Sequence, residues 1–461
     1  MIQYQLLFSR WGLACLSLVL TVAYAQPATP LPGRIAFVSS SGRLATVAPD
    51  GSDMRLLSAI GEVFQFPAWS PVAPQIAAIG SGSQGSRLAV FADDQGVDIA
   101  EREQGRDLQT LYRSQAQAPF YLYWSPDGQR VGFLANHPQE GIGLHMAELA
   151  DSSSSLLRTG SPLYWQWMDA AQLLIHRNGL GDAAQLTLLE LNYTADHTAN
   201  HTERSLDAPG LFQVPGVASS GDFIAFGGRD ALGNGRLVLR DAPTAALTDE
   251  AAGEAASPED SPQVLRQFPH QGLLALSWSP RDDKLAFISP PSAAPHSFGF
   301  LRLLEAHSGE LEVLVEELVL AFFWSPDGRY IAYLTPMLPR PPQEFADAGA
   351  YAASSLAQDM LAQNTAQQAP MPLHLQLSVL ELDSRQSRHL STFVPSDAFL
   401  QQFLPFFDQY ALSHRLWSPD SRALVLPMRT AQGSEAVTVV PIDGSEVQRI
   451  AQGHSAFWSW Q

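Results

Sequence analysis

The sequence predicts an all-β protein, a single β-propeller of four-stranded blades, and three observations carry this prediction. First, one phrase recurs along the chain: an apolar stretch, Trp-Ser-Pro-Asp-Gly, and then a stretch resembling Ile-Ala-Phe, most clearly at 124–133 and 324–333. Second, the copies follow one another at about 40–55 residues, a spacing typical of propellers and repeat arrays. Third, the two ends of the chain hold complementary parts of one incomplete repeat.

Each copy of the phrase predicts a β-hairpin. Pro presets φ at the second position of the turn, Asp bonds its own backbone, and Gly takes the position with φ above zero. The apolar, β-rich flanks form the two strands, and the Trp before the turn packs between neighbouring sheets. The repeated Asp residues are therefore assigned to the turns rather than to catalysis. The structural repeat positions are Trp69, Trp124, Asp127, Gly128, Trp278, Trp324, Asp327, Gly328, Trp417, Asp420 and Trp458.

Two further β-rich runs follow each hairpin, which gives the four strands of a propeller blade. After 131–134, for example, come 143–147 and 155–158. The third repeat, at Trp167, keeps only part of the phrase, and the fourth, near 217–222, lacks both Trp and Pro.

The two chain ends predict how the ring closes. The runs 34–38, 43–47 and 54–57 supply three strands without an inner strand, and 457–461 supplies an inner strand without the other three. A C-terminal strand that joins the N-terminal blade removes the exposed sheet edges. We therefore expect eight blades, with seven as the alternative if the weak fourth repeat merges with a neighbour.

The N-terminal 25 residues predict a Sec-type signal peptide and a bacterial periplasmic or secreted protein. Arg10 precedes an apolar run from Trp11 to Tyr24, and Ala-Tyr-Ala before Gln26 fits a cleavage site. A retained anchor facing outward is the alternative, although the run is short for a membrane span. A lipoprotein anchored at Cys15 is a third possibility. The predicted domains are the signal peptide 1–25, a linker 26–32 and the propeller 33–461.

Composition narrows the classes of partner. The formal net charge is −19 at pH 7, and Lys284 is the only lysine, so the chain should repel nucleic acid and anionic lipid headgroups. Cys15 is the only cysteine, so the propeller contains no disulfide. The expected partner is a protein or peptide in the cell envelope or outside it, bound by a monomer with no integral span after cleavage.

Three insertions interrupt the repeats. A helical insertion at 336–372 joins the second and third strands of its blade, and an aromatic-rich loop at 393–410 joins the fourth strand to the next inner strand. In a propeller both classes of connection lie on one face. An acidic loop at 248–262 joins third and fourth strands, so it lies on the opposite face as a solvated loop.

The aromatics of the first two insertions are the candidate partner-binding residues. They pack on one another, or they form a lid or docking platform whose exposed rings mark a partner site. The candidates are Phe345, Tyr351, Met360, Phe399, Phe403, Phe406, Phe407 and Tyr410.

No motif of known chemistry emerges from the sequence. It contains no Gly-x-Ser-x-Gly nucleophile elbow, no Gly-rich phosphate loop and no Cys/His zinc framework. His197 and His201 lie four apart in a polar loop without a third ligand, and Asp93, Asp94 and Asp98 lack the turn Gly and distal Glu of a calcium loop. No catalytic, cofactor-binding or metal-ligating residue is therefore assigned.

At 124–133 and 324–333 the chain resembles the TolB-type propeller repeat, which also occurs in the propeller domains of prolyl oligopeptidase-like enzymes. The resemblance covers nearly all of 32–461. It implies four-stranded blades, an extracytoplasmic location and a binding role in an envelope assembly. The chain departs from TolB, which has six blades and a separate N-terminal docking domain. It also lacks the hydrolase domain of the peptidases.

The sequence thus favours an extracytoplasmic, non-enzymatic scaffold for protein–protein interaction. The alternative is a small-ligand-binding or enzymatic propeller that uses the central channel, where polar groups from several blades converge. A third possibility is a subunit whose catalytic partner is a separate chain. A ring of acids or histidines at the channel mouth would favour ligand binding or catalysis, and featureless walls would favour the scaffold.

Overall fold

The computed structural model divides the chain into two compact units, Met1–Pro30 and Leu31–Gln461. It describes residues 29–93, 107–178, 184–193, 199–210, 214–243, 264–270, 273–289, 298–337 and 373–461. The predicted signal peptide, the acidic loop 248–262 and nearly all of the helical insertion 336–372 lie outside these ranges. In the described part, no helix is long and apolar enough to cross a membrane.

The described strands form antiparallel sheets in which each strand pairs with the next along the chain, as predicted for propeller blades. Five sheets within the described residues have four strands. The first two consist of β4 (Glu62–Trp69), β5 (Gln75–Gly82), β6 (Gly85–Ala92) and β7 (Asp107–Ser114), and of β8 (Pro119–Trp124), β9 (Arg130–His137), β10 (Gly141–Glu148) and β11 (Ser154–Gly160). The third consists of β12 (Leu163–Trp167), β13 (Gln172–Arg177), β14 (Gln185–Tyr193) and β15 (Ala199–Asp207). The last two consist of β16 (Gly216–Val217), β17 (Phe223–Arg229), β18 (Gly235–Asp241) and β19 (Val264–Pro269), and of β20 (Ala275–Trp278), β21 (Lys284–Ser289), β22 (Gly299–Glu305) and β23 (Leu311–Val319).

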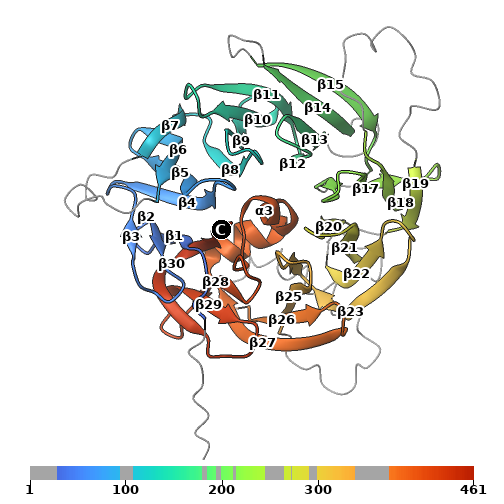
Figure 1. Ribbon diagram of the computed structural model, residues 1–461. Coiled ribbons are helices and arrows are strands. Elements are labelled where there is room, and N and C mark those ends of the chain that lie inside the picture. Colours follow the sequence, from blue (N-terminus) through green and yellow to red (C-terminus); the bar gives the residue numbers. More distant parts are fainter. Residues whose placement is uncertain are drawn as a thin grey trace, which may run out of the picture. The chain divides into compact units, whose positions relative to one another are not determined.

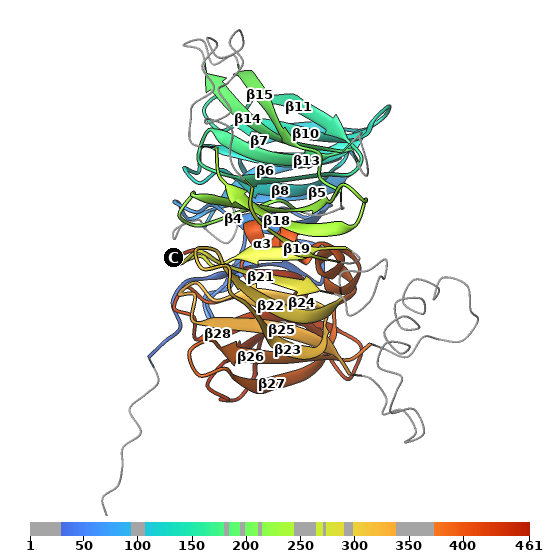
Figure 2. The same ribbon diagram turned by 90° about the vertical axis from the view of Figure 1, so that its right-hand side faces the viewer.

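The remaining strands form one ten-stranded sheet. Its strands, in spatial order, are β24 (Ala321–Trp324), β25 (Tyr330–Pro336), β26 (Leu375–Glu381), β27 (Gln386–Pro395), β28 (Ala423–Arg429), β29 (Glu435–Pro441), β30 (Gln448–Trp458), β1 (Ile35–Ser39), β2 (Leu44–Val47) and β3 (Arg55–Leu56). Figure 1 shows all the sheets arranged around a common centre, and Figure 2 shows them from the side. The protein is thus an all-β propeller. Because the ten-stranded sheet is continuous, the number of blades stays a prediction.

The C-terminal strand closes the ring, as the sequence predicts. The first half of β30 pairs with β29, and its second half pairs with β1, where Ile35 faces Trp458. The backbone N–H of Arg34 also donates to Ser459 Oγ at 2.9 Å, across 425 residues of sequence. One strand therefore serves two neighbouring groups of strands and leaves no free edge between them.

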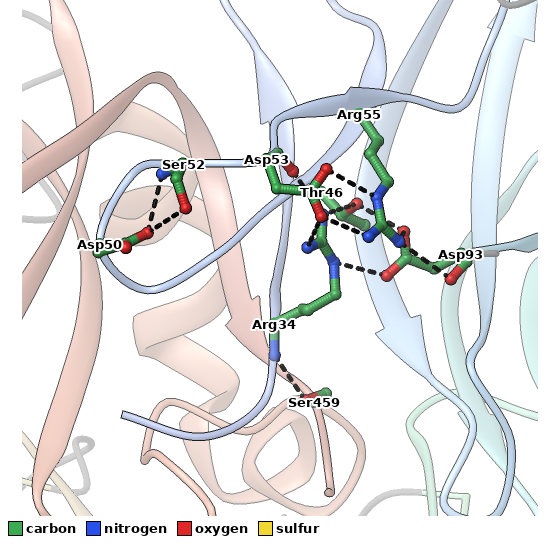
Figure 3. Close-up of polar contacts among 8 residues, drawn as sticks. All are labelled: Arg34, Thr46, Asp50, Ser52, Asp53, Arg55, Asp93 and Ser459. Atoms are coloured by element: carbon green, nitrogen blue, oxygen red, sulfur yellow. Dashed lines mark hydrogen bonds and ion pairs between the residues drawn. The ribbon is translucent and has the colours of Figure 1, made fainter. Parts of the chain in front are cut away.

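A cluster of charged side chains lies beside this closure (Figure 3). Asp93, whose side chain is 1% exposed, lies 2.7 Å from Arg34 Nε and 3.1 Å from Arg55 Nη1. Its carboxylate also accepts from the Thr46 hydroxyl at 2.8 Å, and both arginines pair with Asp53. The closure cluster thus ties the start of the chain to β2, to β3 and to the residue that follows β6.

The repeated turn residues bond one another locally. In the turn that follows Trp124, the Ser125 hydroxyl donates to Asp127 at 2.6 Å and accepts from the backbone N–H of Arg130 at 3.0 Å. Gly128 has φ of 67°, and a Cβ there would come within 2.4 Å of Val72 in the neighbouring turn. This turn therefore favours Gly both for its conformation and for the close contact, whereas Ser421 adopts a positive φ of 61° at the same position of the last copy.

The weak fourth repeat is supported from its neighbour. β16 has only two residues and no Trp. The side-chain amide of Gln166, on the adjacent β12, accepts from the Val217 N–H at 3.0 Å and donates to its carbonyl at 3.4 Å. A polar side chain of the adjacent sheet thus satisfies the Val217 backbone groups on the edge of β16.

Candidate functional site

The centre of the ring is occupied by a helical segment of the chain itself. It consists of a π-helix η3 (Phe399–Phe403), a 3₁₀-helix η4 (Leu404–Phe406) and α3 (Phe407–Ser413), and is called here the central segment. Figure 1 shows α3 inside the circle of sheets, and it contacts β8, β12, β20 and β24. The aromatic-rich stretch 393–410 therefore begins in β27 and ends in the channel.

Aromatic packing explains why this segment lies at the centre. Phe399, Phe403, Phe407 and Tyr410 recur at helical spacing, and all four are buried. The ring of Phe403 lies 5.7 Å from that of Phe457 on β30, the ring of Phe407 lies 5.4 Å from that of Phe322 on β24, and the ring of Tyr410 lies 4.9 Å from that of Phe66 on β4. The central segment thus packs against strands from well-separated parts of the chain.

This packing changes the expectation for the candidate aromatics. Four of them are part of the core, because each finds apolar partners inside the ring, and they present no docking platform. Phe406 alone among the five described candidates is exposed, at 40%. Phe345, Tyr351 and Met360 lie outside the described residues. The docking hypothesis therefore narrows to Phe406 and the surface around it.

The polar groups of the central segment bond to the surrounding strands. Gln409 donates through Nε2 to the Tyr121 hydroxyl at 2.9 Å and to the Trp165 carbonyl at 3.0 Å. Its Oε1 accepts from the Trp165 N–H at 3.2 Å. Tyr121 in turn donates to the Gln409 carbonyl at 2.9 Å. These bonds fix the orientation of α3 relative to β8 and β12 and leave the Gln409 amide fully used.

His414, directly after α3, continues this network. Its Nε2 lies 3.0 Å from the Phe66 carbonyl, and its Nδ1 lies 2.6 Å from the Ser413 hydroxyl. A carbonyl oxygen can only accept, so Nε2 carries the hydrogen and Nδ1 accepts from Ser413. Burial lowers the pKa of His414 to about 4, so the ring is neutral at neutral pH.

Asp408 is the acidic group of the central segment. Its carboxylate accepts from the Gln409 N–H at 3.0 Å, and the Val214 N–H also bonds to it. Burial outweighs these bonds and raises the pKa of Asp408 to about 7. Burial, followed by the nearby Asp408 charge, raises the pKa of Tyr164. Asp408 and His414 thus lie in the channel as buried groups rather than as a ring of charges at its mouth.

A cavity of about 390 Å³ lies where the chain enters the channel. Its lining combines Asp397 and Ala398, just before the central segment, with Arg429 on β28, Gly433 in the turn after β28, Glu435 on β29 and His454 on β30. Antiparallel strands make successive connections emerge on alternate faces. The connections 396–398 and 430–434 belong to the classes that share one face, called here the entry face.

The cavity is lined by a small charged network. Arg429 pairs with Asp397 at 2.6 Å, and the Asp397 N–H donates to Glu435 Oε1 at 2.9 Å. Burial lowers the pKa of His454, which the Glu435 charge opposes. With two carboxylates, one guanidinium and a neutral histidine, the cavity carries a net negative charge at neutral pH.

The described residues contain no group of three side chains arranged to hold a metal ion. His201 contacts Arg158, and burial and this cation lower its pKa. His197 lies outside the described residues, as do Asp94 and Asp98, and Asp93 belongs to the closure cluster.

Sequence reasoning missed the polar residues of both places. Asp397, Arg429, Glu435 and His454 belong to no motif, and they meet only because of the fold. Asp408 and His414 carried a weak signal, because Asp408 is adjacent to Phe407 and His414 follows Tyr410 by four residues, which continues the helical spacing.

Comparisons with known proteins identify no family for this chain. No protein-family model matches the chain, and no curated protein matches it. Similar solved structures include TolB from Acinetobacter baumannii, with 12% identity and a TM-score of 0.35 over 86% of this chain and 82% of that one. Oligogalacturonate lyase from Vibrio parahaemolyticus matches with 10% identity and a TM-score of 0.41, over 92% and 85%. The C-terminal WD40 domain of Sif2 matches with 12% identity and a TM-score of 0.48, over 89% and 92%.

The class of protein is therefore a β-propeller, as the strand pairing itself demonstrates. At these identities and TM-scores, the similar structures carry no argument about its activity.

Proposed function

We propose that this chain is an extracytoplasmic, non-enzymatic binding scaffold of the TolB type, which binds a protein or peptide on its entry face. The observation that carries the proposal is the filling of the ring centre by the central segment, whose polar groups bond to the surrounding strands. Phe406 in the central segment is 40% exposed, and the 390 Å³ cavity lies where that segment begins, at Asp397 and Ala398. Together they supply an apolar and an acidic contact.

The chemistry of this surface favours a partner with apolar and basic groups. An exposed aromatic ring buries a large area against a partner and is typical of binding hot spots. The carboxylates of Asp397 and Glu435 accept hydrogen bonds from a lysine, an arginine or a free amino terminus. The net charge of −19 steers such a partner toward the chain.

Photo-crosslinking tests the entry face directly. The photoreactive residue p-benzoylphenylalanine replaces Phe406 in one variant and Leu156 in another, and both are expressed in the native host. Leu156 has a similar exposure of 43% and lies on β11 after a connection of the other class, on the opposite face. We expect one discrete protein adduct from position 406 alone, and its loss when Glu435→Gln is added. Equal adducts from both positions, or none from either folded variant, would contradict the proposal.

The extracytoplasmic location rests on the predicted signal peptide and is tested separately. Mass spectrometry of the protein purified from its native host should give a mature N-terminus at Gln26. An intact N-terminus in the membrane fraction would instead support an outward-facing anchor.

The cavity also supports a second candidate function, the binding of a small polar ligand. A volume of about 390 Å³ falls in the range of small-molecule sites, and Arg429 and His454 add donors to the two carboxylates. A thermal-shift screen of small polar molecules separates the two functions. A stabilising compound whose effect is lost in Glu435→Gln, together with the absence of crosslinks at position 406, would favour this alternative.

A further inference from the structure

The guanidinium group of Arg204 on β15 has two N–H groups, at Nε and Nη2, that make no hydrogen bond to the described residues. Both nitrogen atoms are buried. These two atoms form the edge of the guanidinium whose N–H bonds run parallel, which matches the two oxygens of a carboxylate or phosphate. The bidentate edge of this partly buried side chain thus has no acceptor among the described residues.

Two other arginines show how this chain ordinarily uses that edge. Arg87 donates through Nε and Nη2 to the two carboxylate oxygens of Glu62, at 2.8 and 2.7 Å. Arg385 does the same with Glu312, at 2.8 and 2.7 Å. The edge of Arg204 lacks the carboxylate that completes this arrangement.

A second guanidinium lies close to Arg204 at the joint between two sheets. Arg240 on β18 donates through Nη1 to the Leu206 carbonyl at 3.1 Å and lies 3.4 Å from Asp207. Burial lowers the pKa of Arg240, and the charge of Arg204 adds to this effect. The charges of Asp207 and Asp241 act on Arg240 in the opposite direction.

An unpaired guanidinium in such a place is unfavourable. Removing a charge from water costs several kcal/mol unless an opposite charge and hydrogen bonds offset it. A bound anion would supply both at once. Two neighbouring guanidiniums from different sheets also hold an anion in a more defined geometry than one flexible side chain does.

We propose that Arg204, with Arg240 beside it, forms a binding site for a small oxyanion at the joint between β15 and β18. Nε and Nη2 of Arg204 each donate to one oxygen of the ligand, and Arg240 adds positive potential. The ligand class is a phosphate, a sulfate or a small carboxylate, which share the paired oxygens that the edge of Arg204 fits. This site is independent of the entry face and of the proposed scaffold function.

Thermal unfolding of the full chain at constant ionic strength tests the site. Sodium phosphate, sulfate or acetate is titrated in exchange for chloride. We expect a saturable rise in Tm of about a few degrees, the size that a ligand at 100 times its Kd produces. A response to phosphate and sulfate identifies a tetrahedral oxyanion, and a response to acetate identifies a carboxylate.

Variants assign the response to Arg204. Arg204→Gln should abolish the rise and, in chloride alone, should unfold at or above the wild-type temperature, because it removes a partly buried charge whose Nε and Nη2 have no partner among the described residues. Arg204→Lys keeps the charge without the bidentate edge and should weaken binding at least about tenfold. The matched control Arg385→Gln loses an edge already occupied by Glu312 and should respond like the wild type.

The proposal also has a readout that needs no variant. In protein labelled with ¹⁵N at arginine Nε, one Nε–H resonance should shift saturably as the anion is added. An equal rise in Tm for wild type and Arg204→Gln would overturn the proposal. The absence of any Tm or Nε–H change beyond that caused by chloride would overturn it as well.

Discussion

The indole Nε1 of Trp124 donates a 2.9 Å hydrogen bond to the backbone carbonyl of Ala68, the residue just before Trp69. Three other repeat tryptophans donate in the same way to a backbone carbonyl next to the repeat tryptophan of the neighbouring repeat. Trp69 donates to Phe457, which precedes Trp458; Trp324 donates to Ser277, which precedes Trp278; and Trp417 donates to Phe323, which precedes Trp324. At these four positions the recurring Trp therefore bonds to the inner strand of the previous repeat. In the repeated phrase, the Trp thus makes a contact with the neighbouring repeat, and the residues after it form a turn within their own repeat.

Removing one of these indole bonds should destabilise the ring measurably. Trp417→Phe loses the 3.0 Å bond to Phe323, whereas Trp278 Nε1 has no hydrogen-bond partner among the described residues. Each indole also stacks on one aromatic ring: the ring centroids of Trp417 and Tyr330 lie 6.5 Å apart, and those of Trp278 and Phe223 lie 6.4 Å apart. Trp278→Phe is therefore a matched control for the volume that is lost. In urea denaturation, Trp417→Phe should cost about 1–2 kcal/mol more than Trp278→Phe. Equal costs would show that the bond contributes nothing.

The closure cluster should matter far more than an exposed ion pair. Asp93→Asn removes a carboxylate that is 1% exposed and leaves Arg34 and Arg55 with only the 49% exposed carboxylate of Asp53 as a shared partner. Breaking a buried pair in this way costs about 3–5 kcal/mol. The control Glu312→Gln breaks a pair whose side chains are 41% and 46% exposed, and should cost less than about 1 kcal/mol. Similar unfolding midpoints for the two variants would contradict the assigned role of Asp93.

The raised pKa of Asp408 predicts that the contribution of this group to the free energy of unfolding falls as the pH rises toward neutral. Its pKa rises from 3.8 to about 7 on folding, so the folded protein keeps a proton that the unfolded chain releases between those values. The contribution to stability is therefore full below about pH 4 and is lost as the pH rises through 7. Asp408→Asn removes this loss, so its stability relative to wild type should increase across that range by about 4 kcal/mol. Parallel pH profiles of the free energy of unfolding would rule this out.

His414 acts in the opposite direction and in a different window. Its pKa falls from 6.5 to about 4 on folding, so the folded state keeps it neutral while the unfolded chain takes up a proton. Stability should therefore fall as the pH decreases from about 6.5 through 4. In protein labelled with ¹⁵N-histidine, this ring should show the neutral Nε2–H tautomer at pH 6, because the Phe66 carbonyl accepts from it. An Nδ1–H tautomer, or a charged ring at pH 6, would be inconsistent with the network.

The repeated phrase predicted much of the fold, because its residues act locally. Ser125 and Asp127 bond within their own turn, and Gly128 adopts its positive φ there, so neighbouring residues suffice to infer the hairpin. The pairing of the C-terminal strand with the N-terminal one also followed from the sequence, because each end lacked what the other supplied.

The candidate site was predicted less well, because it depends on contacts between distant parts of the chain. The aromatics of 393–410 have a helical spacing, but spacing does not say which surface they cover. Phe403 and Phe407 enter the ring because Phe323 and Phe457 offer them aromatic partners there, and only Phe406 lies off that packed side. Residues such as Arg429 and His454 meet through the register of β28 to β30, which no short motif encodes.

The shared strand β30 has a consequence for how the molecule reaches its native state. The residues of β1 are made long before their partners in β30, and the adjoining Arg34–Ser459 bond spans 425 residues of sequence. Contacts of that kind form late, because the entropy of closing the whole chain opposes them. While it is being synthesised, the chain is therefore an arc with two open β-edges, and it is most exposed to mispairing and proteolysis until the final strand docks.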